Sequence, residues 1–141
     1  MTAGPWKARL AALFHIDDSP WRTALALAVG VFISFTPFWG FQTLLALLVA
    51  TAFRLNRGVT LVGTWLNLPW FAPFVYAGAV KLGAVLLPDL SGVAAWSAWL
   101  LVGSMTIGLA AAVLTWIVAF GVFHVRQRRQ ARSARESQPA A

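Results

Sequence analysis

Apolar residues fill three long stretches of the chain that contain no charged side chain. These stretches run from Thr23 to Phe53, from Gly58 to Val80 and from Leu90 to Phe123. A helix needs about 20 mostly apolar residues to cross a bilayer, and each stretch reaches that length. The pattern therefore predicts an all-α integral membrane fold, in which polar residues matter most where they interrupt the stretches.

The first stretch is broken at its centre by Pro37 and Gly40. Proline cannot donate a backbone hydrogen bond, and glycine permits a chain reversal that other residues resist. We expect one helix from Pro20 to about Phe35 and a second from about Phe41 to Phe53. Ser19 suits the N-cap of the first helix, and the proline that follows suits its first position.

Each half of this stretch holds about 13 mostly apolar residues, or about 20 Å of helix, against a hydrocarbon core about 30 Å thick. Neither half crosses comfortably alone. A re-entrant hairpin that enters and leaves on the cytoplasmic face keeps Arg22 and Arg54 on one side, as the positive-inside rule requires. The competing interpretation is a single kinked span over residues 23–53, which puts these arginines on opposite sides.

The second stretch is interrupted by Asn67, Pro69 and Pro73. Two prolines four residues apart remove backbone hydrogen bonds and bend a helix. Irregular backbone at membrane depth is tolerated only where protein or a water-filled cavity covers it. We expect a bent span that continues to Leu87, followed by one full span over residues 90–123. The expected architecture is thus a broken, re-entrant helical hairpin plus two transmembrane helices.

Small residues recur every four positions on two of the predicted helices. They are Ala26, Gly30 and Ser34 on the first helix, and Ser104, Gly108 and Ala112 on the last. Small residues let helix backbones approach closely in membranes. Both stripes are therefore predicted packing faces.

The chain divides into three parts. Residues 1–18 carry Trp6, Leu10 and Leu13 at helical spacing among basic residues, which predicts an amphipathic helix at the membrane interface. Residues 19–125 form the membrane domain. Residues 126–141 combine arginines with Gln, Ser, Ala and Pro, which predicts a basic, disordered cytoplasmic tail.

Composition and charge sharpen this picture. The chain is 60% hydrophobic and only 11% charged, whereas soluble domains carry about a quarter charged residues. The net charge is +7, and the basic residues flank the apolar stretches. Because basic segments stay on the cytoplasmic side, both termini are expected there. The expected partners are the lipid bilayer and either further copies of the chain or another membrane protein; no nucleic acid is expected.

Two motifs carry a resemblance to a known family. They are the run Gly30-Val31-Phe32 with Pro37-Phe38-Trp39-Gly40-Phe41-Gln42-Thr43, and Gly63-Thr64-Trp65 with Pro69. The chain resembles, over about residues 10–125, the bacterial family called domain of unknown function 2062. That resemblance implies a small multi-pass protein of the bacterial inner membrane with no assigned activity. In the family's pattern asparagine directly precedes the first proline of the second motif, whereas here Leu68 does and Asn67 lies one residue earlier.

Paired interrupted hydrophobic segments are a sequence indication of a binding site within the membrane. We expect residues 34–43 and 64–76 to meet there and to line a small polar site. The alternative is that their polar side chains only satisfy backbone groups that the prolines expose. The candidate binding residues are Ser34, Thr36, Gln42, Thr43, Thr64, Asn67, Tyr76 and Lys81. The residues expected to shape the motif are Ser19, Pro20, Gly30, Pro37, Gly40, Pro69 and Pro73.

Lys81 is the one charge inside an apolar context, and intramembrane charges are functional candidates. It either snorkels to the outer interface beside Asp89 or points into a cavity. The few carboxylates and histidines form no catalytic set and no metal site, so neither an enzyme nor a cofactor is expected. Two function classes remain: a membrane scaffold or anchor for a partner, and a small-solute transporter or channel-like protein.

Overall fold

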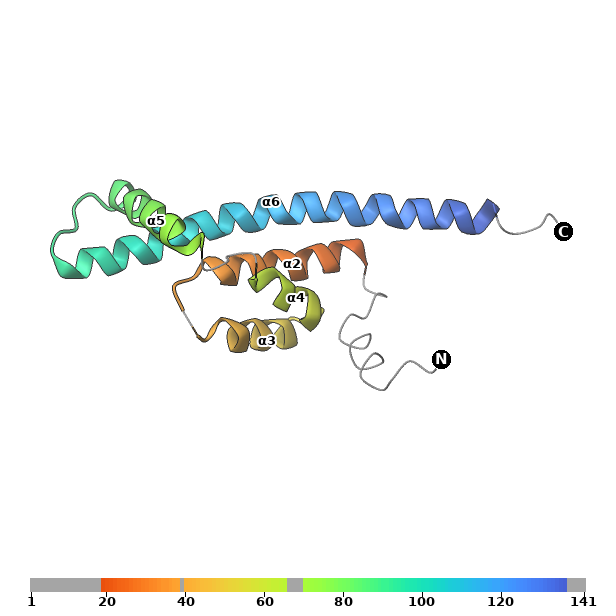
Figure 1. Ribbon diagram of the computed structural model, residues 1–141, viewed down its shortest axis with the longest axis horizontal. Coiled ribbons are helices and arrows are strands. Elements are labelled where there is room, and N and C mark those ends of the chain that lie inside the picture. The colour runs from red at the N-terminus through yellow and green to blue at the C-terminus, as the bar shows by residue number, and fades with distance from the viewer. Residues whose placement is uncertain (1–18, 39, 66–69, 137–141) are drawn as a thin grey trace.

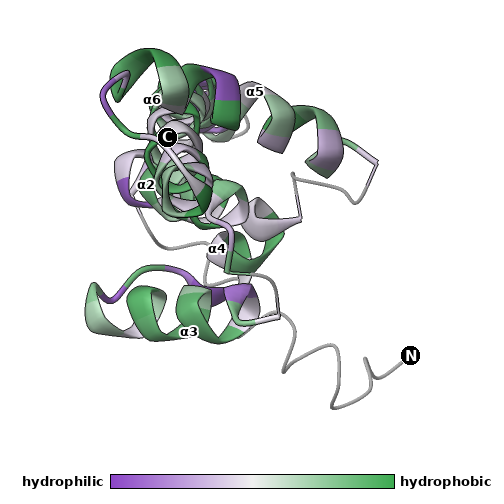
Figure 2. Ribbon diagram, turned by 90° about the vertical axis from the view of Figure 1, so that its left-hand side faces the viewer, coloured by the Kyte–Doolittle hydropathy of each residue, from purple (hydrophilic) through white to green (hydrophobic). Residues whose placement is uncertain are grey.

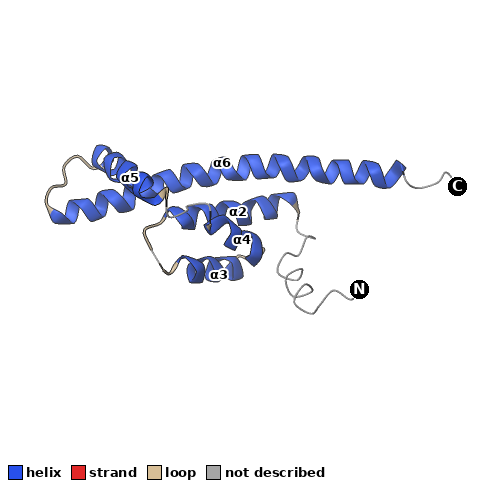
Figure 3. Ribbon diagram, viewed as in Figure 1, coloured by secondary structure: helices blue, strands red, loops and turns tan. Residues whose placement is uncertain are grey.

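The structure is a computed structural model, and it describes residues 19–38, 40–65 and 70–136. Within these ranges every regular element is a helix, as Figure 3 shows. The helices are α2 (Pro20–Phe35), α3 (Gln42–Ala52), α4 (Arg57–Thr64), α5 (Ala72–Leu86) and α6 (Val93–Glu136). The predicted all-α class is confirmed for this part of the chain. The predicted amphipathic segment 1–18, together with Asn67 and Pro69, lies outside the described residues.

One long helix organises the arrangement. In Figure 1, α6 is a rod along the length of the molecule, with α2, α3 and α4 grouped beside its middle and α5 beside its first part. Helix α2 runs antiparallel to α6, and α3 folds back along α2. Helix α4 packs on both α2 and α3. The chain therefore forms a hairpin from α2 and α3 instead of one kinked rod over residues 23–53.

Helix α2 has the bounds that the sequence predicts. Ser19 is its N-cap residue and Pro20 its first helical residue. The Ser19 side chain makes no capping hydrogen bond, but its carbonyl accepts the first helical bond from the Thr23 N–H at 3.1 Å. Because proline has no N–H to satisfy and a fixed φ, it starts the helix without the side-chain cap.

Helix α3 ends in a Schellman motif. The Leu55 N–H donates to the Ala50 carbonyl at 2.8 Å, and the Arg54 N–H donates to the Thr51 carbonyl at 3.2 Å. Leu55 then packs on Ala50 and on Ala26 of α2. The residue with left-handed backbone is Arg54, with φ of 52°. Asn56 and Gly58 follow it in the sequence and belong to residue types that adopt this conformation more readily, but neither one makes the turn. This turn directs the chain into α4, where Asn56 caps the helix by accepting from the Val59 N–H at 3.1 Å.

Helices α2 and α4 touch through their backbones. A Cβ added at Gly30 would lie 2.9 Å from the Gly63 Cα and would overlap the Thr60 carbonyl oxygen. A Cβ added at Gly63 would lie 2.9 Å from the Gly30 Cα. The predicted small-residue stripe of α2 is buried along its length, at Ala26, Gly30 and Ser34. It is a packing face, as the sequence indicates.

Glycines also set the approaches to α6. A Cβ at Gly83 of α5 would overlap the Trp99 carbonyl, and one at Gly103 of α6 would overlap the Ala79 carbonyl. A Cβ at Gly108 would lie 2.9 Å from the Cβ of Phe35 at the end of α2. The second predicted stripe, on α6, is likewise buried at Ser104, Gly108 and Ala112. Short α2 and α5 are therefore both held against α6 at positions that only small residues allow.

The end of α6 differs from the prediction. The sequence predicted a full span over 90–123 and a disordered tail from residue 126, whereas the helix continues from Val93 to Glu136. Arg, Gln and Ala are strong helix formers, and elongation of an existing helix avoids the cost of a new nucleus. Polar composition after residue 125 marks the end of the apolar surface but not the end of the helix.

In the described part of the chain, one helix is long and apolar enough to cross a membrane by length and composition: α6, over Val93–Arg135. Its most apolar window has a mean hydropathy of 2.2, and only 17% of that window is buried. Helices α2, α3 and α5 are apolar but shorter. Figure 2 shows apolar residues along the helices, and many large apolar side chains are exposed, such as Phe74 and Val93. The second span that the sequence predicts is divided into α4 and α5 by the interruption after Thr64.

Substitution of Gly63 by Val is expected to destabilise the fold, because the new side chain meets the backbone of α2. Overpacking of this kind costs about 1–3 kcal/mol. The measurement is the midpoint of thermal unfolding in detergent, followed by helical circular dichroism. Gly78→Val on α5 is the matched control, because an added Cβ there meets nothing within 4 Å. Equal losses in the two variants would contradict backbone contact as the cause.

Candidate functional site

The first interruption closes the end of α2 with its own hydroxyl groups. At Thr36 the backbone N–H and the side-chain hydroxyl both donate to the Ile33 carbonyl, at 3.1 Å and 2.6 Å. Two residues earlier the Ser34 hydroxyl donates to the Val31 carbonyl at 2.6 Å. Both hydroxyl-bearing residues are buried. The last carbonyls of a helix have no intrahelical partner, and these side chains strengthen the bonding of the turn just before them.

Gln42 bridges the interruption. It is the first residue of α3, and its amide nitrogen lies 3.3 Å from the Ser34 carbonyl and 3.3 Å from the Thr36 carbonyl. The turn between the helices passes through Pro37, which has no N–H, and Gly40, whose φ of 86° favours glycine. The structure therefore brings the predicted residues Thr36 and Gln42 together. Thr43, the next residue on α3, is exposed.

The second interruption repeats this chemistry on α4. The Thr64 hydroxyl donates to the Leu61 carbonyl at 2.6 Å, and the buried Thr60 hydroxyl donates to the Asn56 carbonyl at 3.0 Å. Beyond the interruption, Pro73 is in the first turn of α5, where a missing N–H costs nothing. Tyr76 is half-buried on α5, one turn further along.

The end of α2 and the start of α5 lie at one level along α6, near Gly108. Phe35, at the end of α2, contacts Gly108. On the other side, Ala79 packs against Gly103, and antiparallel pairing brings Ala72 level with the residues around Gly108. Thus α2 and α4 approach this level from one end of the molecule, and α5 leaves it toward the other end.

Lys81 lies beyond the level of Gly108, toward the α5–α6 loop. It is on α5 between Ala79 and Gly83, the two residues that face α6, and its side chain is exposed. The described loop that contains Asp89 follows α5. This position puts the lysine nearer to the α5–α6 loop than to either interruption.

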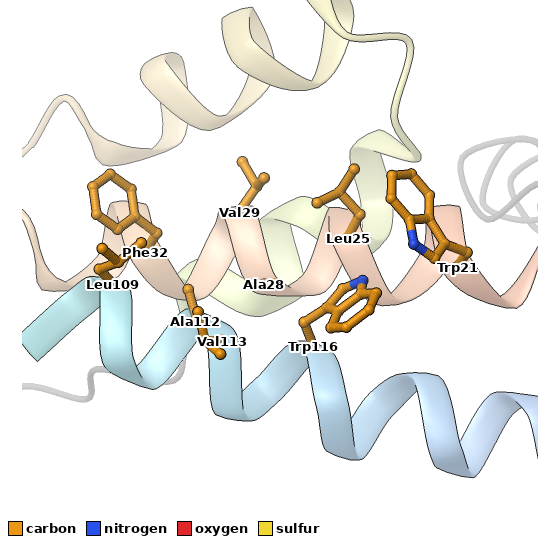
Figure 4. Close-up of a pocket in the computed structure, with 9 residues that line it drawn as sticks. All are labelled: Trp21, Leu25, Ala28, Val29, Phe32, Leu109, Ala112, Val113 and Trp116. Carbon is orange, nitrogen blue, oxygen red and sulfur yellow. The ribbon is translucent and has the colours of Figure 1, made fainter.

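The sequence pattern does not predict two features of the α2 region. The first joins the two ends of the hairpin: the Arg22 guanidinium donates to the Arg54 carbonyl. The second is an apolar groove of about 340 Å³ between α2 and α6, shown in Figure 4. It is lined by Trp21, Leu25, Ala28, Val29, Phe32, Leu109, Ala112, Val113 and Trp116. The four-residue spacing of Trp21, Leu25 and Val29 is the sequence signal that could have indicated an apolar ridge.

The chain matches the family called domain of unknown function 2062, described as an uncharacterised protein conserved in bacteria, over residues 4–132. The chain belongs to this family. The resemblance drawn from the two motifs is therefore confirmed, and the match extends closer to both ends than the motifs do. The family description assigns no activity. No curated protein and no solved structure matches the chain.

Replacement of Gln42 by Leu is expected to lower stability by about 1–3 kcal/mol, because two carbonyls at the interruption lose a donor. Thr43→Val is the matched control: it removes a polar group from the adjacent, exposed position. The free energy of unfolding in detergent, from denaturant titration, compares the two. A Gln42→Leu protein as stable as wild type would show that the amide does not hold α2 to α3.

Proposed function

We propose that this chain is a multi-pass protein of the bacterial inner membrane in which α2 and α3 form a re-entrant hairpin while α4–α5 and α6 cross. The spacing of tryptophans on α6 supports the crossing. Trp96 and Trp116 are about 20 residues apart, or about 30 Å of helix, which is the thickness of the hydrocarbon core. Tryptophan is enriched at both membrane interfaces. Contact of Phe35 with Gly108 then puts the tip of the hairpin near the midplane.

The placement of charge supports cytoplasmic termini. Arg22 and Arg54 meet at one end of the hairpin. Trp21, beside Arg22, packs edge-on against Trp116 with ring centroids 6.3 Å apart, and the arginines of α6 begin at Arg126 on the same side. The positive-inside rule assigns this side to the cytoplasm and the α5–α6 loop to the outside. Lys81 then snorkels toward the outer interface.

Within this topology we infer a scaffold or anchor for a membrane partner. The main supporting observation is that the hydroxyl and amide groups at both interruptions donate hydrogen bonds to neighbouring backbone carbonyls. They stabilise irregular backbone at membrane depth, as bilayer-embedded interruptions require. Large apolar side chains meanwhile face outward, such as Phe74 and Val85 on α5, at 77% and 76% exposure. A surface of this kind suits lipid and the apolar helices of a partner or of further copies.

A small-solute transporter or channel-like protein is the second candidate. It is favoured by the two interruptions at one level, the arrangement in which transporters bind substrates. Thr43, Tyr76 and the undescribed Asn67 would then contribute to a polar site with Thr36, Gln42 and Thr64. A chain of 141 residues would need further copies to enclose a pathway.

Single cysteines test the topology cleanly, because the chain has none of its own. Cysteines at positions 38, 57, 90 and 130 are treated with a membrane-impermeant maleimide in vesicles of both orientations. We expect positions 57 and 130 to react from the cytoplasmic side, position 90 from the outside, and position 38 from neither. Reaction of position 38 from the outside would favour a full crossing by α2, and reaction of all four positions from one side would exclude both spans.

Reconstituted vesicles separate the two functions. We expect protein-containing vesicles to pass small neutral solutes and potassium no faster than vesicles of lipid alone, measured by osmotic light scattering and a potassium-sensitive dye. A photoreactive amino acid at Phe74 on α5 is expected to cross-link to one discrete membrane protein in cells. A selective flux that Gln42→Leu abolishes, with folded protein at normal level, would instead identify a transporter.

A further inference from the structure

The apolar groove between α2 and α6 continues across α2 into a second groove. The second groove, of about 330 Å³, lies between α2 and α3 and is lined by Trp21, Arg22, Leu25, Val29, Val49, Phe53 and Leu55. The two share Trp21, Leu25 and Val29, so these residues form a ridge with a groove on each side. We call the combined surface the α2 trough. Helices α3 and α6 form its walls and α2 forms its floor; Figure 1 shows α2 between the other two helices, and Figure 4 shows the α6 side.

Positive charge marks one end of the α2 trough. Arg22 lines the second groove directly. Arg54, whose carbonyl accepts a hydrogen bond from Arg22, lies in the turn after α3, and Arg57 begins α4. An elongated apolar surface thus leads to the Arg22 side chain, which is bonded to the backbone of the turn after α3.

We propose that the α2 trough binds one anionic phospholipid from the cytoplasmic leaflet. Its two acyl chains lie in the two grooves, one on each side of the ridge, and its phosphate lies against Arg22. This proposal rests on the proposed membrane topology, which puts Trp21 and Arg22 at the cytoplasmic interface. Arginine pairs strongly with phosphate oxygens and is weakly hydrated, so it suits this boundary.

The shape of the trough favours two chains over a second copy of the protein. A helix with its side chains is about 10 Å across and needs one continuous furrow. Here the ridge of Trp21, Leu25 and Val29 divides the floor, and Trp21 is 49% exposed on top of it. Flexible acyl chains fit on either side of such a ridge. The charged end then distinguishes an anionic headgroup from a zwitterionic one.

Native mass spectrometry of the full chain, in neutral detergent, tests this directly. The probes are phosphatidylglycerol and phosphatidylcholine with identical acyl chains, added in equal amounts. We expect wild type to retain phosphatidylglycerol preferentially. Arg22→Gln is expected to reduce that preference about fivefold, the effect of about 1 kcal/mol for one basic residue near a charged lipid surface. Lys81→Gln, at an exposed lysine on α5, is the matched charge control and should leave the preference unchanged.

A second variant tests the grooves themselves. Val113 lines the α6 wall and is 49% exposed, so Val113→Trp fills the groove without entering the core. It should reduce retention of both lipids, with thermal unfolding like that of wild type. Inorganic phosphate at millimolar concentration should not displace the lipid, because the acyl chains contribute to binding.

Three outcomes would overturn the proposal. They are an unchanged phosphatidylglycerol preference in Arg22→Gln, full lipid retention in Val113→Trp, and a lipid-free dimer of wild type that Val113→Trp dissociates. The last would assign the trough to a second copy. Failure of the topology would appear separately, in the cysteine labelling pattern, so the failure of one proposal can be distinguished from the failure of the other.

Discussion

Direct contact between helix backbones is the constraint on which the rest of this structure depends. Gly30 and Gly63 bring α2 and α4 together with no side chain between them, and Gly83 and Gly103 do the same for α5 and α6. In the proposed membrane topology, apolar surface alone gives helices little reason to associate, so dispersion at such close crossings would provide much of the attraction. Helix α4 is only eight residues long, below the length at which an isolated helix is stable. It exists because α2 and α3 hold it.

The polar residues at the interruptions follow from the same constraint. Short helices that stop at mid-molecule leave their last carbonyl groups without intrahelical partners, and a backbone hydrogen bond left unmade away from water is expensive. Thr36 and Thr64 donate into the turn behind them, and Gln42 donates across the gap. The interruptions are thereby fixed positions in the fold, which is what allows α2 and α3 to fold back on each other reproducibly.

The sequence predicts where the helices begin and end far better than it predicts how they pack against one another. The bounds of α2 followed from Ser19, Pro20 and Pro37, because capping and proline chemistry act locally. The pattern does not predict the extension of α6 to Glu136, because the polar composition after residue 125 is typical of disorder, whereas Arg and Ala favour helix. Gln42 was a candidate from sequence, but its two carbonyl partners depend on how α3 returns. The α2 trough was missed altogether, since it needs residues from three helices that only the fold brings together.

The continuous helix from Trp116 to Glu136 has a mechanical consequence. A disordered tail would let the terminal arginines sample a wide volume, whereas eleven helical residues from Arg126 form a stiff spacer about 16 Å long. Arg128, Arg132 and Arg135 recur along one side of that spacer. If α6 tilts where it contacts α2, this stiff segment therefore moves as one body and carries its arginines with it. The distance of Glu136 from the other helices is set by the length of the helix.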